Sequence, residues 1–214
     1  MKPFRLLLCA VTCLTGFLAF APVVLGQNGS SVHDVVSFAS GPKSKVYNSD
    51  SSFLGLAQNV CQNSSSPAKC PSDATLYGFD GGGWLADLSK IPTATWIYAP
   101  GVAGSTSPAQ FVQYFFETSL FMPGAPTAGV LYLAADDAAQ VVVNGTFIGA
   151  IGSVEDIRKA TDAQNRLHKF DITKFLVAGR NQITIRLVNG PFGGEIDDYS
   201  NRPSGVVFGG FATW

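Results

Sequence analysis

Charge is scarce in this sequence, and neither sign dominates. Only 14% of the 214 residues are charged, with 14 Lys and Arg against 15 Asp and Glu. Together with 46% hydrophobic residues, this composition argues against a disordered, solvating chain. The balanced charge gives no excess of Lys and Arg that would form a positively charged surface for nucleic acid. The only two histidines, His33 and His168, stand alone, which argues against a histidine-rich metal enzyme.

Motifs of several enzyme classes are also missing. The sequence holds no Gly-x-Ser-x-Gly nucleophile elbow and no His-Glu-x-x-His zinc motif. The glycine run at residues 81–83 is followed by Trp84 and not by the Lys-Ser/Thr pair of a phosphate-binding loop. Glycoside hydrolysis stays open, because it needs two suitably spaced carboxylates and spacing cannot be read from sequence.

Residues 1–26 have the layout of a secretory signal peptide. Lys2 and Arg5 precede an apolar run at residues 6–20, and Val24-Leu25-Gly26 supplies compact side chains before a cleavage point. The alternative is that this run is a membrane anchor, but it is short for a span across the bilayer. No later stretch of the sequence is apolar enough to cross a membrane. We therefore expect a secreted protein, extracellular or associated with a cell wall.

Export would leave two cysteines in the mature chain, Cys61 and Cys70. In an oxidising compartment they predict one disulfide, with two buried free thiols as the alternative. Acceptor sequons for N-glycosylation begin at Asn28, Asn63 and Asn144. The third fits a turn without a glycan equally well.

From residue 84 onward, short strands alternate with glycine- and proline-rich turns. In residues 111–121, Gln113 and Glu117 fall on the face opposite to Tyr114 and Phe116. In residues 182–188, the same alternation places Arg186 outward, opposite to Ile185 and Leu187. Asn144-Gly145 is a strong hairpin signal. Many short strands predict an all-β fold, an antiparallel sandwich of jelly-roll type with one or two short helices. The expected strands are residues 96–98, 111–121, 130–134, 140–143, 146–148, 167–170, 182–188 and 206–211.

The region before residue 94 has a weaker pattern. Residues 27–52 are polar and serine-rich, which predicts an extended arm, and residues 51–63 fit a short helix. A second helix is expected to run to about residue 163, with Ser153 as its cap. We expect residues 27–93 to form an arm and a disulfide-stapled loop packed on a sandwich core of residues 94–214.

Two segments carry a resemblance to a known family. Residues 131–145 are an apolar strand, Asp136-Asp137, a second apolar strand and Asn144-Gly145. Phe170-Asp171-Ile172-Thr173 follows, and Gly179-Arg180-Asn181 leads into another strand. This order resembles galactose-binding-like jelly-roll domains over about residues 94–214. The resemblance implies the sandwich fold and carbohydrate binding, since such domains accompany glycoside hydrolases and occur as lectins.

The paired aspartates have two interpretations. Asp136 and Asp137 lie where a strand must reverse, and their side chains can accept hydrogen bonds from backbone N–H groups. The resemblance makes a structural calcium ion plausible, because hard cations bind several oxygens. Asp136 and Asp137 are weak candidates for such a site, and no cofactor is otherwise required.

The long irregular segment at residues 189–205 is the candidate sugar-binding region, with a merely solvated loop as the alternative. Carboxylates, amides and guanidinium groups can bind hydroxyl pairs, and an aromatic ring can stack on a pyranose. Trp84 is a further stacking platform, made exposed or mobile by the preceding glycines; Trp96 and Tyr98 are platforms or core residues. The loop candidates are Phe192, Glu195, Asp197, Asp198, Tyr199, Asn201 and Arg202.

These features favour a secreted, non-catalytic, lectin-like protein that binds extracellular or cell-wall glycans. One alternative is a structural or adhesive protein of a cell wall or matrix that associates with itself. The other is a secreted hydrolase, for which Glu195→Gln and Asp197→Asn would abolish release of reducing sugar.

Overall fold

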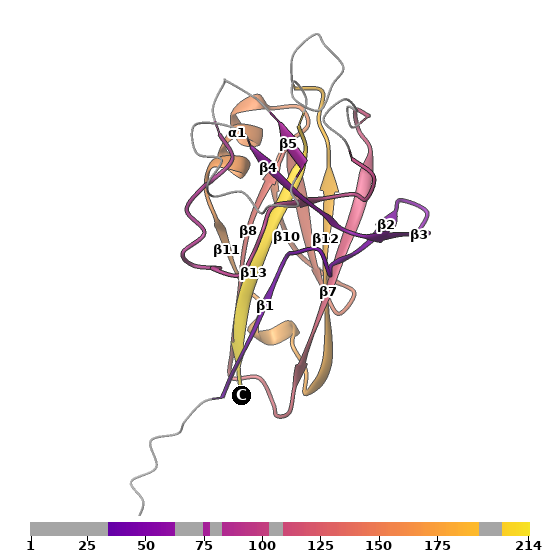
Figure 1. Cartoon of the computed structure of the whole chain (residues 1–214). Helices are drawn as coiled ribbons and strands as arrows, with labels where there is room; N and C mark the ends of the chain where they lie inside the picture. The colour runs from indigo at the N-terminus through magenta and orange to yellow at the C-terminus, as the bar shows by residue number, and fades with distance from the viewer. Residues whose placement is uncertain (1–33, 63–74, 78–82, 103–108, 193–202) are drawn as a thin grey trace, which may run out of the picture. The chain divides into compact units, whose positions relative to one another are not determined.

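Two β-sheets packed face to face form the described part of the chain (Figure 1). The computed structural model describes residues 34–62, 75–77, 83–102, 109–192 and 203–214, all within one unit that spans His33–Trp214. The predicted all-β antiparallel sandwich is therefore confirmed. No helix in the described ranges is long and apolar enough to cross a bilayer.

One sheet has seven strands in the order β11-β8-β13-β6-β4-β5, with β1 also paired to β13. Its pairs are antiparallel except for β4 and β5, which run parallel. The strands are β1 (Val35–Ala39), β4 (Gln58–Gln62), β5 (Thr75–Tyr77), β6 (Ile97–Tyr98), β8 (Ala128–Asp136), β11 (His168–Asp171) and β13 (Gly205–Thr213).

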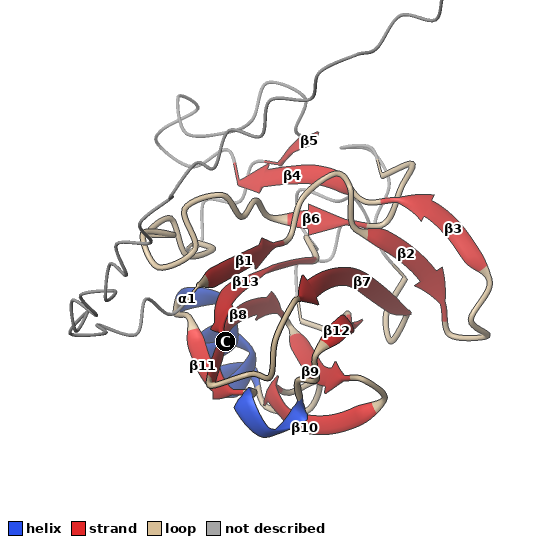
Figure 2. Ribbon diagram, turned by 90° about the horizontal axis from the view of Figure 1, so that it is seen from below, coloured by secondary structure: helices blue, strands red, loops and turns tan. Residues whose placement is uncertain are grey.

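The other sheet has six antiparallel strands in the order β10-β9-β12-β7-β2-β3. Figure 2 shows β2 and β3 continuing this sheet beyond β7. The strands are β2 (Lys45–Asn48), β3 (Phe53–Leu56), β7 (Gln113–Met122), β9 (Ala138–Val143), β10 (Thr146–Gly152) and β12 (Gly179–Val188).

Period-two alternation places the core between the sheets. On β12, Ile183, Ile185 and Leu187 are buried, while Thr184 and Arg186 point to the other side and are half-buried. β7 pairs with β12 along its whole length and buries Phe116, Leu120 and Met122 on the same side. Each such side chain contributes about 1.5–3 kcal/mol by leaving water, so the alternating strands fix which face is inside.

The predicted Asn144-Gly145 turn joins β9 to β10. Both residues have positive φ, 49° and 79°, as a tight hairpin turn requires. The Asn144 Nδ2 donates to the Phe175 carbonyl at 2.9 Å and to the Asn181 Oδ1 at 2.8 Å, and its Oδ1 accepts from the Gln182 N–H. The side chain therefore serves the turn, which supports the interpretation without a glycan. The sequons at Asn28 and Asn63 lie outside the described residues.

The expected helix at residues 51–63 is wrong. This stretch forms β3 and β4, which belong to different sheets. The segment expected as an arm supplies β1 and β2, so residues before 94 build both sheets. The reason is non-local: β2 gains its backbone partners from β7, about 70 positions later in the chain. Cys61 lies in β4 and is disulfide-bonded, but its predicted partner Cys70 is outside the described residues.

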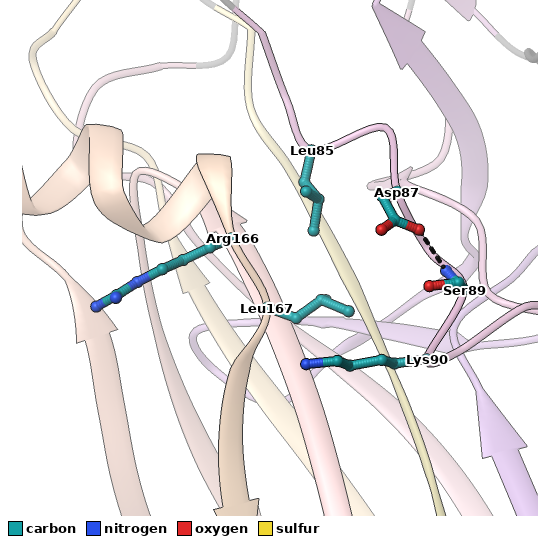
Figure 3. A pocket seen from close by; sticks show the side chains of 6 residues that line it. All are labelled: Leu85, Asp87, Ser89, Lys90, Arg166 and Leu167. Atoms are coloured by element: carbon teal, nitrogen blue, oxygen red, sulfur yellow. Dashed lines mark hydrogen bonds between the residues drawn. The ribbon is translucent and has the colours of Figure 1, made fainter.

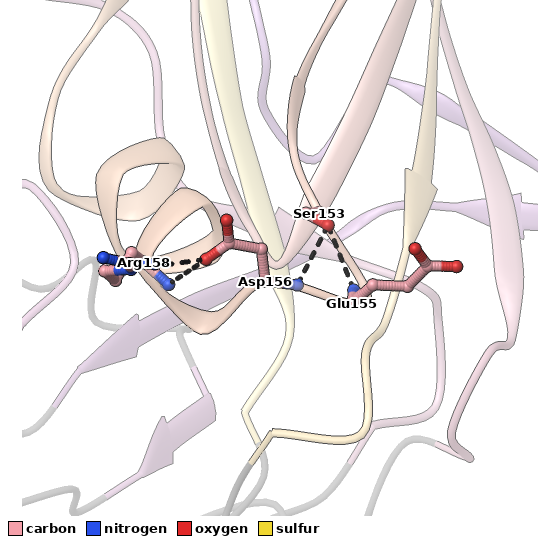
Figure 4. Close-up of polar contacts among 4 residues, drawn as sticks. All are labelled: Ser153, Glu155, Asp156 and Arg158. Atoms are coloured by element: carbon pink, nitrogen blue, oxygen red, sulfur yellow. Dashed lines mark hydrogen bonds and ion pairs between the residues drawn. The ribbon is translucent and has the colours of Figure 1, made fainter.

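The helix after β10 begins later than expected. Helix α1 spans Ile157–Asn165, and its N-cap is Asp156, whose carboxylate accepts from the Arg158 N–H at 3.0 Å (Figure 4). The Ser153 hydroxyl instead accepts from the Glu155 and Asp156 N–H groups, which forms the turn before the helix (Figure 4). A 3-10 turn, η2 (Thr173–Phe175), follows β11, and the Asp171 carboxylate accepts from the Thr173 N–H.

Candidate functional site

Most residues of the predicted sugar-binding loop lie outside the described part of the chain. Trp84 and Phe192 are described, and Phe192 is half-buried where β12 has ended. The loop's role therefore stays a prediction. The loop candidates outside the described residues are Glu195, Asp197, Asp198, Tyr199, Asn201 and Arg202.

Trp84 is buried and not an exposed stacking platform. Its side chain is 8% exposed and stacks on Trp96, with ring centroids 4.3 Å apart. The backbone of Gly205 approaches the indole so closely that a Cβ there would lie 2.5 Å from the ring. Trp96 and Tyr98 are buried as well, as the core interpretation of these two residues required. The aromatic cluster thus packs the end of the sandwich.

Asp136 and Asp137 join the two sheets. β8 ends at Asp136 in the seven-stranded sheet, and β9 begins at Ala138 in the six-stranded one, so the expected reversal is a crossing between layers. Asp136 and Asp137 are only 5% and 4% exposed. The Trp84 Nε1 donates to the Asp136 Oδ2 at 2.8 Å, and the Gly190 N–H donates to the Asp137 Oδ2 at 2.7 Å.

The same pair holds both ends of the segment that contains the predicted loop. Gly190 is bound by the Asp137 carboxylate on one side of that segment. On the other side, the Ser204 hydroxyl donates to the Asp136 carbonyl at 2.8 Å. The crossing therefore anchors residues 190 and 204 at the same end of the sandwich, which is a positioning role.

Burial controls the protonation of the pair. Loss of water, together with the neighbouring Asp137 charge, raises the pKa of Asp136 well above its usual value. Burial also raises the pKa of Asp137, while hydrogen bonds from Asp136 and Gly190 act in the opposite direction. The two side chains share a hydrogen bond. Burial therefore makes both carboxyls harder to ionise, and the effect is larger at Asp136.

This arrangement suits neither a glycosidase pair nor a calcium site. Glycosidase carboxyls stand about 5 Å or more apart on either side of the bond they cleave, whereas Asp136 and Asp137 touch and are buried. A calcium ion needs six to eight oxygens, and these two carboxyls already bind protein groups. Within the described ranges, no group of three or more His, Cys, Asp or Glu side chains is placed to hold a metal.

A shallow polar pocket of about 190 Å³ lies between the end of α1 and the segment after Trp84 (Figure 3). Its two cations already have partners. Lys90 Nζ lies 5.5 Å from the centre of the Tyr132 ring, and the Arg166 guanidinium pairs with Asp162 at 2.8 Å. Figure 3 shows Arg166 extending away from Lys90. The lining residues are Leu85, Asp87, Ser89, Lys90, Arg166 and Leu167.

A row of polar and aromatic side chains crosses the six-stranded sheet on the side away from the core, called here the outer face. Its centre is the guanidinium clamp, made of Arg186, Gln113 and Gln140. Gln113 Oε1 accepts from Arg186 Nε at 3.1 Å and from Nη2 at 2.7 Å. Gln140 Oε1 accepts from Nη1 at 3.0 Å. Two neutral amides from flanking strands therefore fix the orientation of the guanidinium.

Three aromatic residues extend the row from the clamp. Strand register places Phe115 opposite Arg186, Tyr47 opposite Phe115, and Phe53 opposite Tyr47. The Tyr47 and Phe53 rings are 5.5 Å apart between centroids, and Phe53 is 58% exposed. At about 4.8 Å per strand, the row from Gln140 to Phe53 is about 19 Å long. It offers ring surface and hydrogen-bonding groups side by side.

The outer face has an excess of positive charge. Lys45, Arg180 and Arg186 lie on it, and none of them is within ion-pair distance of a carboxylate among the residues the structure describes. The Glu117 carboxylate, opposite Lys45, accepts from the Gln182 side-chain amide. Among the described residues, the groups that bind the Arg186 guanidinium are therefore neutral amides.

The sequence showed half of this row. The alternation in residues 111–121 placed Gln113 and Glu117 outward, and the same pattern on the late strand placed Arg186 outward. Tyr47 and Phe53 were missed, because residues 27–52 were interpreted as an arm and residues 51–63 as a helix. The signal that could have found them is the short alternating stretch Lys45-Val46-Tyr47, in which only Val46 is buried.

Several solved glycoside hydrolases contain parts similar to this chain. An α-L-rhamnosidase of Streptomyces avermitilis, solved with L-rhamnose, is 18% identical with a TM-score of 0.39, over 53% of this chain and 10% of that one. An FMN-binding β-glucuronidase from Facaelibacterium prausnitzii L2-6 is 15% identical with a TM-score of 0.41, over 83% and 22% of the two chains.

A β-glucuronidase of an uncultured Clostridium sp. is 11% identical with a TM-score of 0.42, over 86% of this chain and 30% of that one. The present chain thus spans less than a third of each of these hydrolases. Neither a protein-family profile nor a curated protein sequence matches it.

Proposed function

We propose that this chain is a secreted, non-catalytic carbohydrate-binding protein that acts on extracellular or cell-wall glycans. The outer face carries the proposal: a fixed guanidinium and two amides adjoin three aromatic side chains in one row across the sheet. Sugars present hydroxyl pairs to planar polar groups and a C–H face to aromatic rings, so this combination suits them.

The buried acid pair has a positioning role and not a catalytic one. Asp136 and Asp137 are in direct contact and are closed off from solvent, so they cannot stand on opposite sides of a glycosidic bond. Their bonds to Gly190 and to the Ser204 hydroxyl instead fix the ends of the segment that includes the predicted loop. In the proposal, that loop adds contacts from Glu195, Asp197 and their neighbours.

Membership of the galactose-binding-like superfamily is part of the proposal. The motif residues that carry the resemblance lie at turns of the sandwich: Asn144-Gly145 joins β9 to β10, and Asp171 to Thr173 leads into η2. The proposal also includes removal of residues 1–26 as a signal peptide and secretion of the protein from the cell.

A glycan array probed with residues 27–214 tests the proposal. We expect binding to at least one glycan, weakened at least about threefold by Phe53→Ala, because the exposed ring would be lost from the row. The matched control is Phe211→Ala, an exposed ring on β13 of the other sheet, which should leave binding unchanged. No signal on any glycan would overturn the proposal. An equal loss of glycan binding in both variants would show that the outer face is not the binding surface.

Self-association is the second candidate, and one observation favours it. β3 is the edge strand of its sheet, and Phe53, Leu54 and Leu56 on it are exposed. Unpaired edges with apolar side chains can pair with a second chain, as a structural or adhesive protein requires. Light scattering over a concentration series distinguishes the candidates: a strict monomer excludes this one, and assembly lost on Leu56→Lys supports it.

A further inference from the structure

The guanidinium clamp has a feature that carbohydrate binding in general does not require. An arginine has five N–H groups. Gln113 and Gln140 accept from three of them, one on each of the nitrogens Nε, Nη2 and Nη1. Within the described part of the chain, the second N–H on each terminal nitrogen of Arg186 has no acceptor. Two such donors on one planar group match the two oxygens of a carboxylate.

The charge of the outer face also favours a carboxylate ligand. On the described strands of this face, the Glu117 carboxylate faces Thr184 and Lys45 in the strand register, accepts from Gln182 and forms no ion pair with Arg186. Lys45 and Arg180 add two more positive charges to the face. The whole chain nevertheless has a net charge of −1. A ligand attracted to this particular face is therefore negatively charged.

We propose that the outer face binds a polysaccharide containing uronic acids, with a sugar carboxylate on Arg186 and the sugar ring against Phe115 and Tyr47. Phe115 lies directly opposite Arg186 on the neighbouring strand, so one sugar residue reaches both. The amides of Gln113 and Gln140 hold the guanidinium in place before binding, which lowers the entropy lost when the carboxylate docks. This inference rests on the proposed carbohydrate-binding function and names its ligand class.

Polygalacturonate and the same polymer with its carboxylates reduced to alcohols are the probes. The two polymers share a sugar backbone, so any difference in their affinities measures the contribution of the carboxylate. This comparison requires no variant of the protein. We expect residues 27–214 to bind polygalacturonate at least about tenfold more tightly in affinity electrophoresis or calorimetry. A sulfated galactan, with charge but no planar carboxylate, should bind more weakly than polygalacturonate.

Arg186→Gln should remove about tenfold of the affinity for polygalacturonate and leave the affinity for the reduced polymer unchanged. Arg158→Gln, which removes an exposed charge on α1, is the charge-matched control and should bind like the wild type. Arg186→Lys keeps the positive charge but loses the planar guanidinium with its paired N–H donors, so this variant should also bind polygalacturonate more weakly. Thermal unfolding of each variant shows that the fold is retained.

The outcomes separate the two levels of the proposal. Equal affinity for both polymers, wild-type binding by Arg186→Gln, or preference for the sulfated galactan would overturn the uronic-acid inference while leaving carbohydrate binding intact. Absence of binding to every glycan and polymer would overturn both.

Discussion

The indole of Trp84 donates a hydrogen bond of 2.8 Å to the carboxyl of Asp136, across 52 positions of sequence. This bond joins the aromatic cluster at the end of the sandwich to the crossing between the two sheets. It gives a buried carboxyl a fixed partner at the point where the chain changes layer.

Replacing Trp84 by Phe should destabilise the protein by about 1–3 kcal/mol or more, because a buried oxygen of Asp136 loses its donor and the smaller phenyl ring fills less of the space that the indole occupied. Urea denaturation measures the change. Trp214→Phe is the control, since that half-buried indole packs near Gly124 and serves no buried carboxyl in the described structure. Equal stability of Trp84→Phe and wild type would show that the bond contributes nothing.

The raised pKa of Asp136 makes the stability of the protein depend on pH. Because burial raises the pKa of Asp136 above its unfolded value of about 3.9, the native state holds the proton more tightly. The resulting stabilisation is complete below about pH 4 and is lost as the pH rises through the native pKa. Asp136→Asn keeps an acceptor for Trp84 and a donor for Asp137, so its stability should fall less between about pH 4 and pH 8.

Free energies of unfolding over this pH range, measured by denaturant titration, test the idea. Asp171→Asn is the control: that carboxylate is exposed, and its hydrogen bonds with Thr173 lower its pKa, so its stabilisation is lost only as pH falls. It should leave the decline above about pH 4 unchanged. If the free energy of unfolding of Asp136→Asn declined as steeply with pH as that of the wild type, protonation of Asp136 would not be the cause of the decline.

Gly210→Ala should unfold the protein or prevent its accumulation. A Cβ at this position of β13 would lie 1.9 Å from the Val130 carbonyl oxygen on the adjacent strand, which cannot move without breaking the ladder. Gly41→Ala is the matched control, because its nearest neighbour would be the Thr95 hydroxyl at 3.8 Å. Expression level and melting temperature compare the two, and a normal melting temperature for Gly210→Ala would contradict the close approach.

Asn144 should carry no glycan when the protein is secreted by eukaryotic cells. Glycosylation would take the side-chain nitrogen that donates to Phe175 and Asn181. Peptide mass spectrometry after amidase deglycosylation in oxygen-18-labelled water reports occupancy site by site. Quantitative modification of Asn144 in the folded protein would show that these bonds are dispensable, whereas Asn28 and Asn63 remain predicted sites.

The strands with strict alternation were predictable, and the short ones were not. β12 and the outward residues of β7 follow from period-two burial, because each has one face in the core. β2 and β3 have four residues each; β2 pairs with β7, far along the chain, and β3 is added to the sheet through β2. No local pattern carries that information, so residues 51–63 resembled a helix.

The candidate site was predictable to a similar extent. Arg186 and Gln113 could be placed outward, but their contact joins residues 73 positions apart, and Tyr47 depends on strands that the sequence did not show. Trp84 was expected to be exposed after three glycines. Its burial depends on Gly205 and Asp136, both distant in sequence, which leave a slot for the ring.

β13 has consequences for biosynthesis. It pairs with β8 along one side and with β1 and β6 in succession along the other, and all three come earlier in the chain. As the polypeptide leaves the ribosome, the edges of these strands that face β13 must wait for their common partner, although β8 can already pair with β11 and β6 with β4. Correct folding of this sheet is therefore a late event, completed only when residues 205–213 have emerged.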